Sequence, residues 1–487
     1  MPNAKSLNPN FGLILSISLH SAAIIAFQIS LMKLISIVQW HHFAYMIISI
    51  AMLGFGASGT LLALARRHML DASSWLVPFL MILSGLLMVL VFPVGRAGIF
   101  RFDVFLLFSG GGGFTVLLLN YLLFFLPFFT GALAIGIAFI KNSQQIGSYY
   151  FGNLVGSGAG GILALFLAAN VEPVQVPTMV GLLPVVSGLL IIKRTHLKRT
   201  LPLTILALFA SVYLLIRPVA VNPSEYKDIE LARQLPEAEV IITKPSIYGL
   251  VEVVESPAQR FSPALSLKFT DNLPSGKAIF VNGDYYGHVM QFVEGHSRHI
   301  LDYTTKGLPY FFGHRHRILV INAGSGTLIS QALQNGAKQV DATIENHAIV
   351  SLLRNELKEA SGGIFLSPSV NVFQGHARNF LAGNDAGTYD LIVLPILSEF
   401  GGGAGLNALR EEYSFTLEAF AKMIRRLSPG GVIAISTWKD HPPRHSLKIA
   451  ATLTQAALEA GFEKPSEHIV AVRSWGAITF LLKNSPF

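Results

Sequence analysis

The side chains with the clearest chemical potential lie around Leu319–Leu333, where an apolar run enters a glycine turn and leaves as a predicted helix. Gly324 and Gly326 let the backbone approach a bound ligand closely. Glu345 ends the next predicted strand about 20 residues later, where an acidic side chain commonly binds ribose hydroxyls. The alternative is a turn that only reverses the chain, with Glu345 as a solvated strand end. The predicted nucleoside site comprises Asn322, Gly324, Ser325, Gly326, Glu345, His376 and Ala377.

These residues need a parallel, doubly wound sheet to bring them together. From Arg317 onward, predicted strands alternate with predicted helices, which is typical of a Rossmann-like α/β fold. The strands are "RILVINAG", "QVDATIE", "NVFQG", "YDLIVLPIL" and "VIAIST", and the tail from Ile469 supplies a closing hairpin. Ligands of such sheets lie at the carboxyl ends of the strands, where the strand order reverses. His376 and Ala377, which follow the third strand, would then lie beside a stacked base.

Two other kinds of sequence precede this fold. The alternating runs "AEVIITKPSIYGLVEVVES", "LSLKFT" and "AIFVNGDYY" predict a small antiparallel sheet. Earlier in the chain, long charge-free apolar runs predominate. We therefore expect a transmembrane helical domain over 1–220, a small antiparallel β-domain over 221–310 and a Rossmann-like domain over 311–487.

The composition supports a membrane protein, because 52% of the residues are hydrophobic and only 13% are charged. A membrane span needs about 20 mostly apolar residues. The region 104–140 is predicted to hold one span after a glycine-rich bend, with two short spans as the alternative. The segment from Phe11 has no signal-peptide cleavage site, so we predict that it is retained as a span. The seven predicted spans are 11–37, 43–65, 75–94, 115–140, 150–169, 176–192 and 201–216.

The lysine and arginine residues between the spans predict an orientation. With seven spans, Arg96 and Arg101 fall on one side. The cations on the other side are Lys5, Arg66, Arg67, Lys141, Lys193, Arg194, Lys198 and Arg199. An excess of cations marks the cytoplasmic side, so the N-terminus is predicted to be cytoplasmic and the C-terminal half to lie outside. Two spans over 104–140 would instead place the C-terminal half in the cytoplasm. The net charge of +8 is thus explained by loop cations that set the membrane orientation, and no nucleic-acid partner is expected.

Other ionisable groups suggest weaker functions. Lys33 lies late in the first span, where an ionisable residue is a functional hypothesis, although a lysine there also reaches the interface. The neighbouring His41 and His42 could ligate a metal or haem, but an interfacial belt is favoured. The spacing of His314 and His316 would suit a metal on a strand edge, but "GHRHR" is more simply interpreted as a basic surface turn at the lipid headgroups. The chain has no cysteine, which excludes disulfides and thiolate ligands, and no metal site is predicted.

Several segments resemble a known family. "RILVINAGSGTLISQAL", "TIEN", "FQGHARNFL", "YDLIVLP" and "FTLEAFAKMIRRLSPGGVIAIST" follow one another as in the polyamine aminopropyltransferases, or spermidine synthases. "FGASGTLLAL", "LPFFTGALAIGIAF" and "YYFGNLVGSGAGG" resemble the membrane-embedded spermidine-synthase-like proteins of bacteria, so the resemblance covers nearly the whole chain. It implies a fold of the S-adenosylmethionine-methyltransferase and spermidine-synthase type in a bacterial inner membrane. It also implies S-adenosylmethionine or its decarboxylated form as a ligand, with Glu345 on the ribose.

The chain departs from that family where the family uses acids. The resemblance implies an aspartate at Ser325 and another, contacting the adenine amino group, at His376. Pro395 and Ser398 stand where two aspartates would follow the fourth strand, the second of which is the family's catalytic base. A Tyr-His-Glu motif is also absent from "RHILDYTTKGLPY", which has Asp302 and Tyr303 nearby. Aminopropyl transfer needs carboxylates to hold a cationic polyamine and to take its proton, so spermidine synthesis is not expected.

Two functions remain. We expect a pseudoenzyme, a non-catalytic structural or assembly subunit that docks onto other membrane or periplasmic subunits. The alternative is a membrane-tethered transferase that uses S-adenosylmethionine or its decarboxylated form, with Glu399 as the base if its loop shifts by one residue. Adenosylmethionine is cytoplasmic, so the predicted outside location favours the first. A transporter with Lys33 in its pathway would need repeats that the sequence lacks. The chain ends at "LLKNSPF", where the larger membrane relatives continue, which implies a partner that supplies the missing part.

Overall fold

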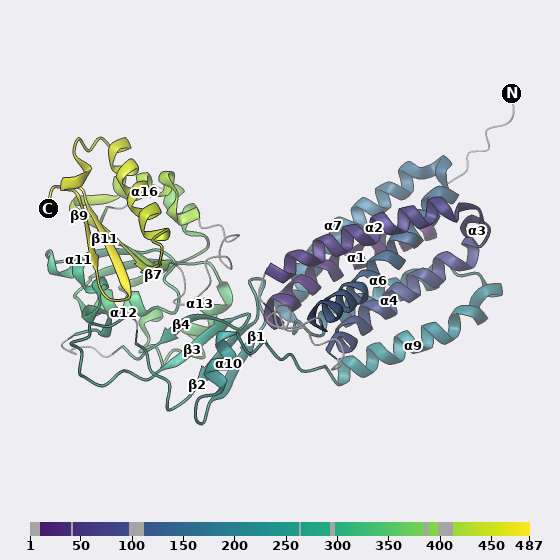
Figure 1. Ribbon diagram of the computed structural model, residues 1–487, viewed down its shortest axis with the longest axis horizontal. Helices are drawn as coiled ribbons and strands as arrows, with labels where there is room; N and C mark the ends of the chain where they lie inside the picture. Colours follow the sequence, from purple (N-terminus) through teal and green to yellow (C-terminus); the bar gives the residue numbers. More distant parts are fainter. Residues whose placement is uncertain are drawn as a thin grey trace. The chain divides into compact units, whose positions relative to one another are not determined.

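The computed structural model divides into two compact units (Figure 1). The first contains Met1–Lys227 and Pro245–Leu250, and the second contains Asp228–Lys244 and Val251–Phe487. The structure describes residues 10–39, 42–96, 112–262, 264–292, 298–383, 388–397 and 413–487. Lys5, His41, Arg101, Ser398 and Glu399, which carry predictions above, lie outside these ranges.

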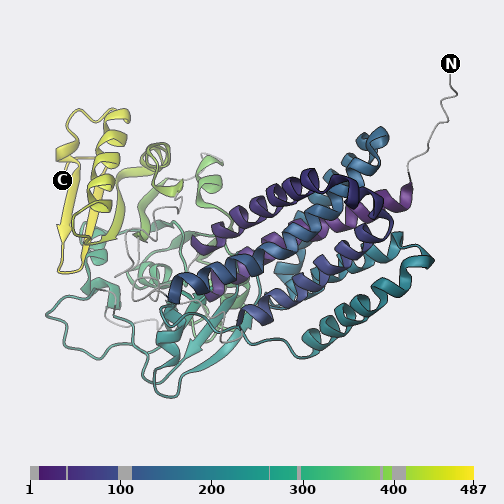
Figure 2. The same cartoon turned by 45° about the vertical axis from the view of Figure 1, so that its right-hand side comes forward.

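The first unit is built from long apolar helices that run side by side (Figures 1 and 2). They are α1 (Phe11–Val38), α2 (His42–Leu64), α4 (Ser73–Arg96), α6 (Gly112–Lys141), α7 (Ile146–Asn170), α8 (Val176–Ile191) and α9 (Leu197–Ile216), with the short α3 (Arg66–Asp71) between α2 and α4. Six helices in the described ranges are long and apolar enough to cross a membrane, and α8 is shorter, with 16 residues. The unit is therefore compatible with a multi-pass membrane protein.

The outer surface of these helices is apolar. Met52, Ile162 and Phe209, on three different helices, are 70%, 73% and 68% exposed. Soluble proteins rarely leave such large side chains uncovered over a wide area, whereas lipid tails would cover them.

The region with two alternative interpretations forms one helix where it is described. α6 runs without interruption from Gly112 to Lys141, with Pro127 inside it. The predicted span at 115–140 therefore lies within a single helix, and residues 104–111 fall outside the described ranges.

Although α8 is short, it runs between the two ends of the bundle. A Cβ placed on Gly181 would lie 2.9 Å from the carbonyl oxygen of Gly85, and one on Gly188 would lie 2.7 Å from that of Pro78. As residue numbers rise along α8 they fall along α4, so the two helices are antiparallel. The end of α8 therefore lies beside the start of α4, the same end from which α9 departs.

Glycines on α7 bring its backbone against α1. A Cβ on Gly156 would lie 2.1 Å from the carbonyl oxygen of Ser18, and one on Gly160 would lie 2.2 Å from that of Ala22. Such an approach is possible only without side chains, as in the small-residue interfaces of membrane helices. The hydroxyl of Ser21 adds a polar link by donating to Asn153 Oδ1 at 2.7 Å.

The second unit begins with a small antiparallel sheet. Its strands are β1 (Glu239–Lys244), β2 (Val251–Glu255), β3 (Lys277–Val281) and β4 (Asp284–Val289), in that spatial order. β3 and β4 form a hairpin across Asn282 and Gly283, whose φ angles are 55° and 77°. Two positive φ angles define the tight turn that the Asn-Gly sequence favours.

A seven-stranded sheet completes the second unit (Figure 1). In sequence order its strands are β5 (Arg317–Val320), β6 (Gln339–Ile344), β7 (Val370–Gln374), β8 (Tyr389–Leu397), β9 (Leu427–Trp438), β10 (Ile469–Arg473) and β11 (Ala477–Lys483). Their spatial order is β10-β11-β9-β8-β5-β6-β7, with β5 to β9 parallel and β11 antiparallel to both of its neighbours. This is a Rossmann-like α/β sheet closed by a hairpin, and its order reverses between β5 and β8.

The central strands β5, β6, β8 and β9 are largely buried on both faces, which explains their nearly continuous apolar sequences. Ile318 and Val320 of β5 belong to one apolar cluster, which also contains residues of the small sheet, of α12 (Thr327–Gln334) and of α13 (His347–Arg354). Leu319 belongs to a second cluster, which includes residues of α15 (Leu417–Arg425) and α16 (His445–Glu459). The small sheet thus packs on the same face as α12, beside the glycine turn.

Candidate functional site

The glycine turn after β5 is held by hydrogen bonds within its own unit. The N–H of Asn322 donates to Thr343 Oγ1 at 2.9 Å, and the N–H of Ala323 donates to the carbonyl oxygen of Thr343 at 2.8 Å. Asn322, Gly324 and Gly326 have φ angles of 49°, 59° and 93°. Asparagine and glycine tolerate this left-handed region, which accounts for the residue types in the turn.

The side chain of Ser325 faces the small sheet. It is only 5% exposed, and its hydroxyl donates to the carbonyl oxygen of His288 in β4 at 2.6 Å. β4 approaches so closely that a Cβ on Gly287 would lie 2.6 Å from Ser325 Oγ. The side chain that replaces the expected acid is therefore used to join the turn to β4.

Glu345 is exposed immediately after β6. Burial, and to a smaller degree the negative charge of Glu345, raises the pKa of Tyr286 to about 12, so this phenol of β4 is within electrostatic range of the carboxylate. Tyr286 was not predicted as a site residue. The sequence placed it in the small β-domain, and no local signal shows that its strand reaches the carboxyl end of β6.

His376 and Ala377 begin α14 (Ala377–Ala382) after β7. The imidazole Nδ1 of His376 accepts the N–H of Arg378 at 3.1 Å and so caps this helix. The His376 ring also lies 5.9 Å from the Tyr413 ring in an edge-to-face arrangement. The Ala377 side chain is fully buried in the apolar cluster that contains Leu319.

The predicted residues come together at one edge of the large sheet. β5, β6 and β7 are adjacent and parallel, so the turn at 322–326, Glu345 and His376 all lie at carboxyl ends of neighbouring strands. Their binding of a nucleoside stays a prediction. Pro395 lies in β8, and the residues that follow Leu397 are outside the described ranges.

Asp302 is engaged in the fold. Its carboxylate accepts the Gln331 amide at 2.8 Å and the Asn335 amide at 3.1 Å, and it also accepts the N–H of His299 at 3.1 Å. Three donors tie this acid to α12 and to the preceding turn. Burial lowers the pKa of Lys306, four residues later, to about 8.

The histidine pair before β5 gives no metal site. The rings of His314 and His316 stack 5.9 Å apart, and no group of three or more His, Cys, Asp or Glu in the described residues is placed to hold a metal ion. Between them, Arg315 is only 6% exposed and donates to the carbonyl oxygens of Pro309, Phe312, Asp390 and Gly430. Arg315 is therefore a structural residue, which the sequence interpretation as a basic surface turn missed.

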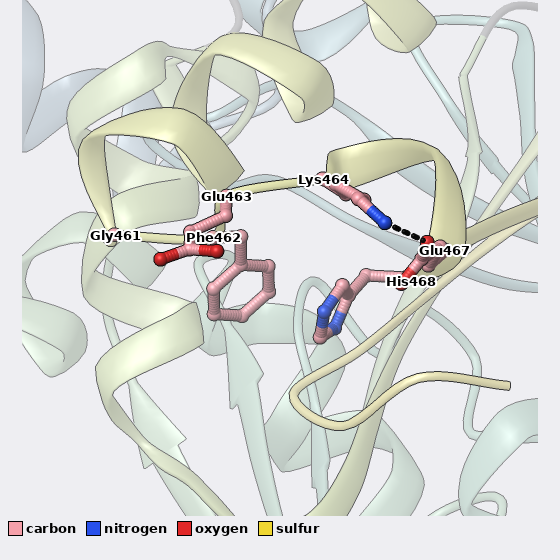
Figure 3. Close-up of a pocket in the computed structure, with 6 residues that line it drawn as sticks. All are labelled: Gly461, Phe462, Glu463, Lys464, Glu467 and His468. Carbon is pink, nitrogen blue, oxygen red and sulfur yellow. Dashed lines mark hydrogen bonds and ion pairs between the residues drawn. The ribbon is translucent and has the colours of Figure 1, made fainter.

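A surface hollow of about 340 Å³ lies elsewhere in this unit (Figure 3). The Phe462 and His468 rings face each other there at 4.4 Å, and Lys464 pairs with Glu467 at 3.1 Å. The hollow lies where β10 begins and β11 ends. At that end of β11, Lys483 pairs with Val432, which is near the amino end of the parallel strand β9. It is thus at the opposite edge of the sheet from Glu345.

Comparison with known proteins finds no matching family model and no matching curated protein. Among solved structures, a spermidine synthase complexed with the transition-state analogue AdoDATO is 12% identical, with a TM-score of 0.34 over 51% of this chain and 73% of that one. Spermidine synthase from Thermotoga maritima is 12% identical, with a TM-score of 0.35 over 51% of this chain and 74% of that one. A probable spermidine synthase from Corynebacterium glutamicum is 16% identical, with a TM-score of 0.34 over 52% and 82%. The strand order and connections of this chain themselves define its Rossmann-like fold.

Proposed function

We propose that this protein is a multi-pass membrane protein whose Rossmann-like unit is a non-catalytic structural or assembly module that docks onto membrane partners. The observation that carries the proposal is the hydrogen bond from Ser325 Oγ to the carbonyl oxygen of His288. At the position where the sequence resemblance implies a ligand-binding acid, the side chain is short, buried and used for packing.

The remaining polar groups at this edge support the same function. At the described carboxyl ends of β5, β6 and β7, Glu345 is the one carboxylate. His376 Nδ1 is occupied as a helix cap. Transfer to an amine needs a base close to the attacking nitrogen. At these described strand ends, Glu345 has no second carboxylate beside it that could hold a cationic amine while the first takes its proton.

A second candidate is a membrane-tethered transferase that uses S-adenosylmethionine or its decarboxylated form. The electrostatic coupling of Glu345 to Tyr286 favours it, because an exposed carboxylate and a phenol at the carboxyl ends of a parallel sheet suit ribose hydroxyls.

The test is calorimetry of the full-length protein in detergent with S-adenosylmethionine and with its decarboxylated form. The proposal expects no saturable binding and no aminopropyl or methyl transfer to added amines. Binding that is lost in Glu345→Gln and kept in the matched Glu359→Gln variant, together with transfer to an added amine, would establish the transferase instead. Glu359 is also exposed and lies away from the strand ends.

We further propose a bacterial inner-membrane location with the N-terminus in the cytoplasm and the second unit in the periplasm. The passage of α8 between the two ends of the bundle supports an odd number of crossings. Reporter fusions at residue 487 that are active on only one side of the membrane test this orientation, and a cytoplasmic signal would exclude it.

A further inference from the structure

Two loops at one end of the helical unit lie against each other. One joins α2, α3 and α4, and the other joins α8 to α9. Ser74 Oγ is 3.3 Å from His196 Nε2, and the guanidinium of Arg199 lies 5.7 Å from the centre of the Trp75 ring. These contacts fix the two loops as one surface.

This surface is strongly positive. We call it the basic face, and it consists of Arg66, Arg67, Lys193, Arg194, Lys198 and Arg199, all of which are exposed. The two loops, residues 65–75 and 192–200, contain one acid, Asp71. Like charges held this close repel one another, and a bound anion would relieve that repulsion.

The start of α9 shows the same need for an anion. Its first turn contains Lys198 and Arg199. Within this turn, all of whose residues the structure describes, there is no acidic residue and no side-chain cap. Cations are unfavourable at the positive end of a helix dipole, where an acid is usual.

Apolar side chains border the basic face. Leu64 at the end of α2 is 83% exposed, and Leu201 on α9 is 46% exposed. Trp75 is half-buried beside them, and tryptophan is typical of the membrane interface. A free anion needs no apolar border, whereas an amphiphile with a negative headgroup and acyl chains fits both parts.

We propose that the basic face binds the phosphate of an anionic phospholipid headgroup, with Arg194, Lys198 and Arg199 on the phosphate. The acyl chains lie along α2 and α9, and Trp75 is at the glycerol level. The inference rests on the proposed membrane location and adds a lipid preference to it. Basic pockets between membrane helices bind such headgroups in this way.

The experiment uses the full-length protein in nanodiscs made of phosphatidylcholine alone or mixed with phosphatidylglycerol, followed by native mass spectrometry of the lipids that remain bound. We expect phosphatidylglycerol to be retained over phosphatidylcholine. The variant with Arg194→Gln, Lys198→Gln and Arg199→Gln should lose that preference, by about fivefold for each cation removed. The single variant Lys198→Gln, which keeps the Arg199–Trp75 contact, should show one such step if the triple variant does not fold.

Arg217→Gln is the matched control, because Arg217 is exposed at the opposite end of α9. It should leave the preference unchanged. Equal retention of both lipids, or an unchanged preference in the triple variant, would overturn the proposal. Displacement of the lipid by inorganic phosphate alone would also overturn it, in favour of a free-anion site. Failure of the protein to enter phosphatidylcholine nanodiscs would instead contradict the proposed membrane location.

Discussion

His288 should make the second unit sensitive to acid. Its side chain is only 2% exposed and stacks on Phe261 at 5.1 Å, and its Nε2 atom is buried with no hydrogen-bond partner among the described groups. Burial lowers the pKa of His288 to about 4, so the native protein holds the neutral ring. The unfolded chain takes up a proton near the ordinary value of about 6.5.

The sign and size of the effect follow from these two values. Between them, the unfolded state binds more protons than the native state, so stability falls as the pH falls through this window. For this one group, the free energy of unfolding should fall by about 2 kcal/mol between pH 7 and pH 5. Replacing the ring by an apolar one of similar shape, in His288→Phe, should remove that loss and keep the packing on Phe261.

The assay is urea unfolding of the full-length protein in detergent at both pH values, followed by the fluorescence of Trp438 and Trp475, which belong to the second unit. A background with Trp40→Phe and Trp75→Phe removes the signal of both tryptophans of the first unit. His314→Gln is the control, because this histidine is exposed. An equal loss of stability in wild type and in His288→Phe would refute the reasoning.

Three further predictions concern packing and a buried hydrogen bond. Gly156→Ala should lower the thermal stability of the purified protein by forcing α7 away from α1, at a cost of about 1–3 kcal/mol, whereas Gly158→Ala, whose added Cβ meets nothing within 4 Å, should not. Gly326→Ala should destabilise the second unit in urea by about 1–3 kcal/mol, because φ is 93° and the new Cβ would lie 2.6 Å from a buried phenyl ring. Tyr389→Phe should cost about 1–3 kcal/mol in the same assay by removing the 2.9 Å hydrogen bond to the Asp341 carboxylate, and an unchanged midpoint would contradict it.

The helices and the succession of strands along the chain could be predicted because hydrophobic patterning determines them locally. A membrane helix must satisfy its backbone internally and cover itself with apolar side chains, so the predicted span at 43–65 falls almost on α2. The alternation of strands and helices after Arg317 likewise predicted the large sheet. The predicted span at 176–192 likewise falls almost on α8, so the short length of this helix could be predicted from its apolar run.

The orientation of side chains at the candidate site could not be predicted in this way. Whether Ser325 faces a ligand or the fold depends on β4, whose His288 carbonyl oxygen is 37 residues away in sequence. Tyr286 is close to Glu345 for the same reason, through the packing of the small sheet beside the turn. Arg315 was misinterpreted because a cation in a histidine-rich turn has the sequence of a surface loop, although four carbonyl oxygens surround it.

In the proposed membrane location, the shortness of α8 has a consequence for the bilayer itself. Sixteen helical residues rise about 24 Å, whereas the hydrocarbon layer of a typical membrane is about 30 Å thick. Hydrophobic mismatch of this size is met by local thinning of the bilayer or by drawing polar neighbours inward. The loop drawn inward at the end of α8 begins with Lys193 and Arg194. The protein should therefore be most stable in lipids with short acyl chains, and the bilayer next to it should be locally thinner.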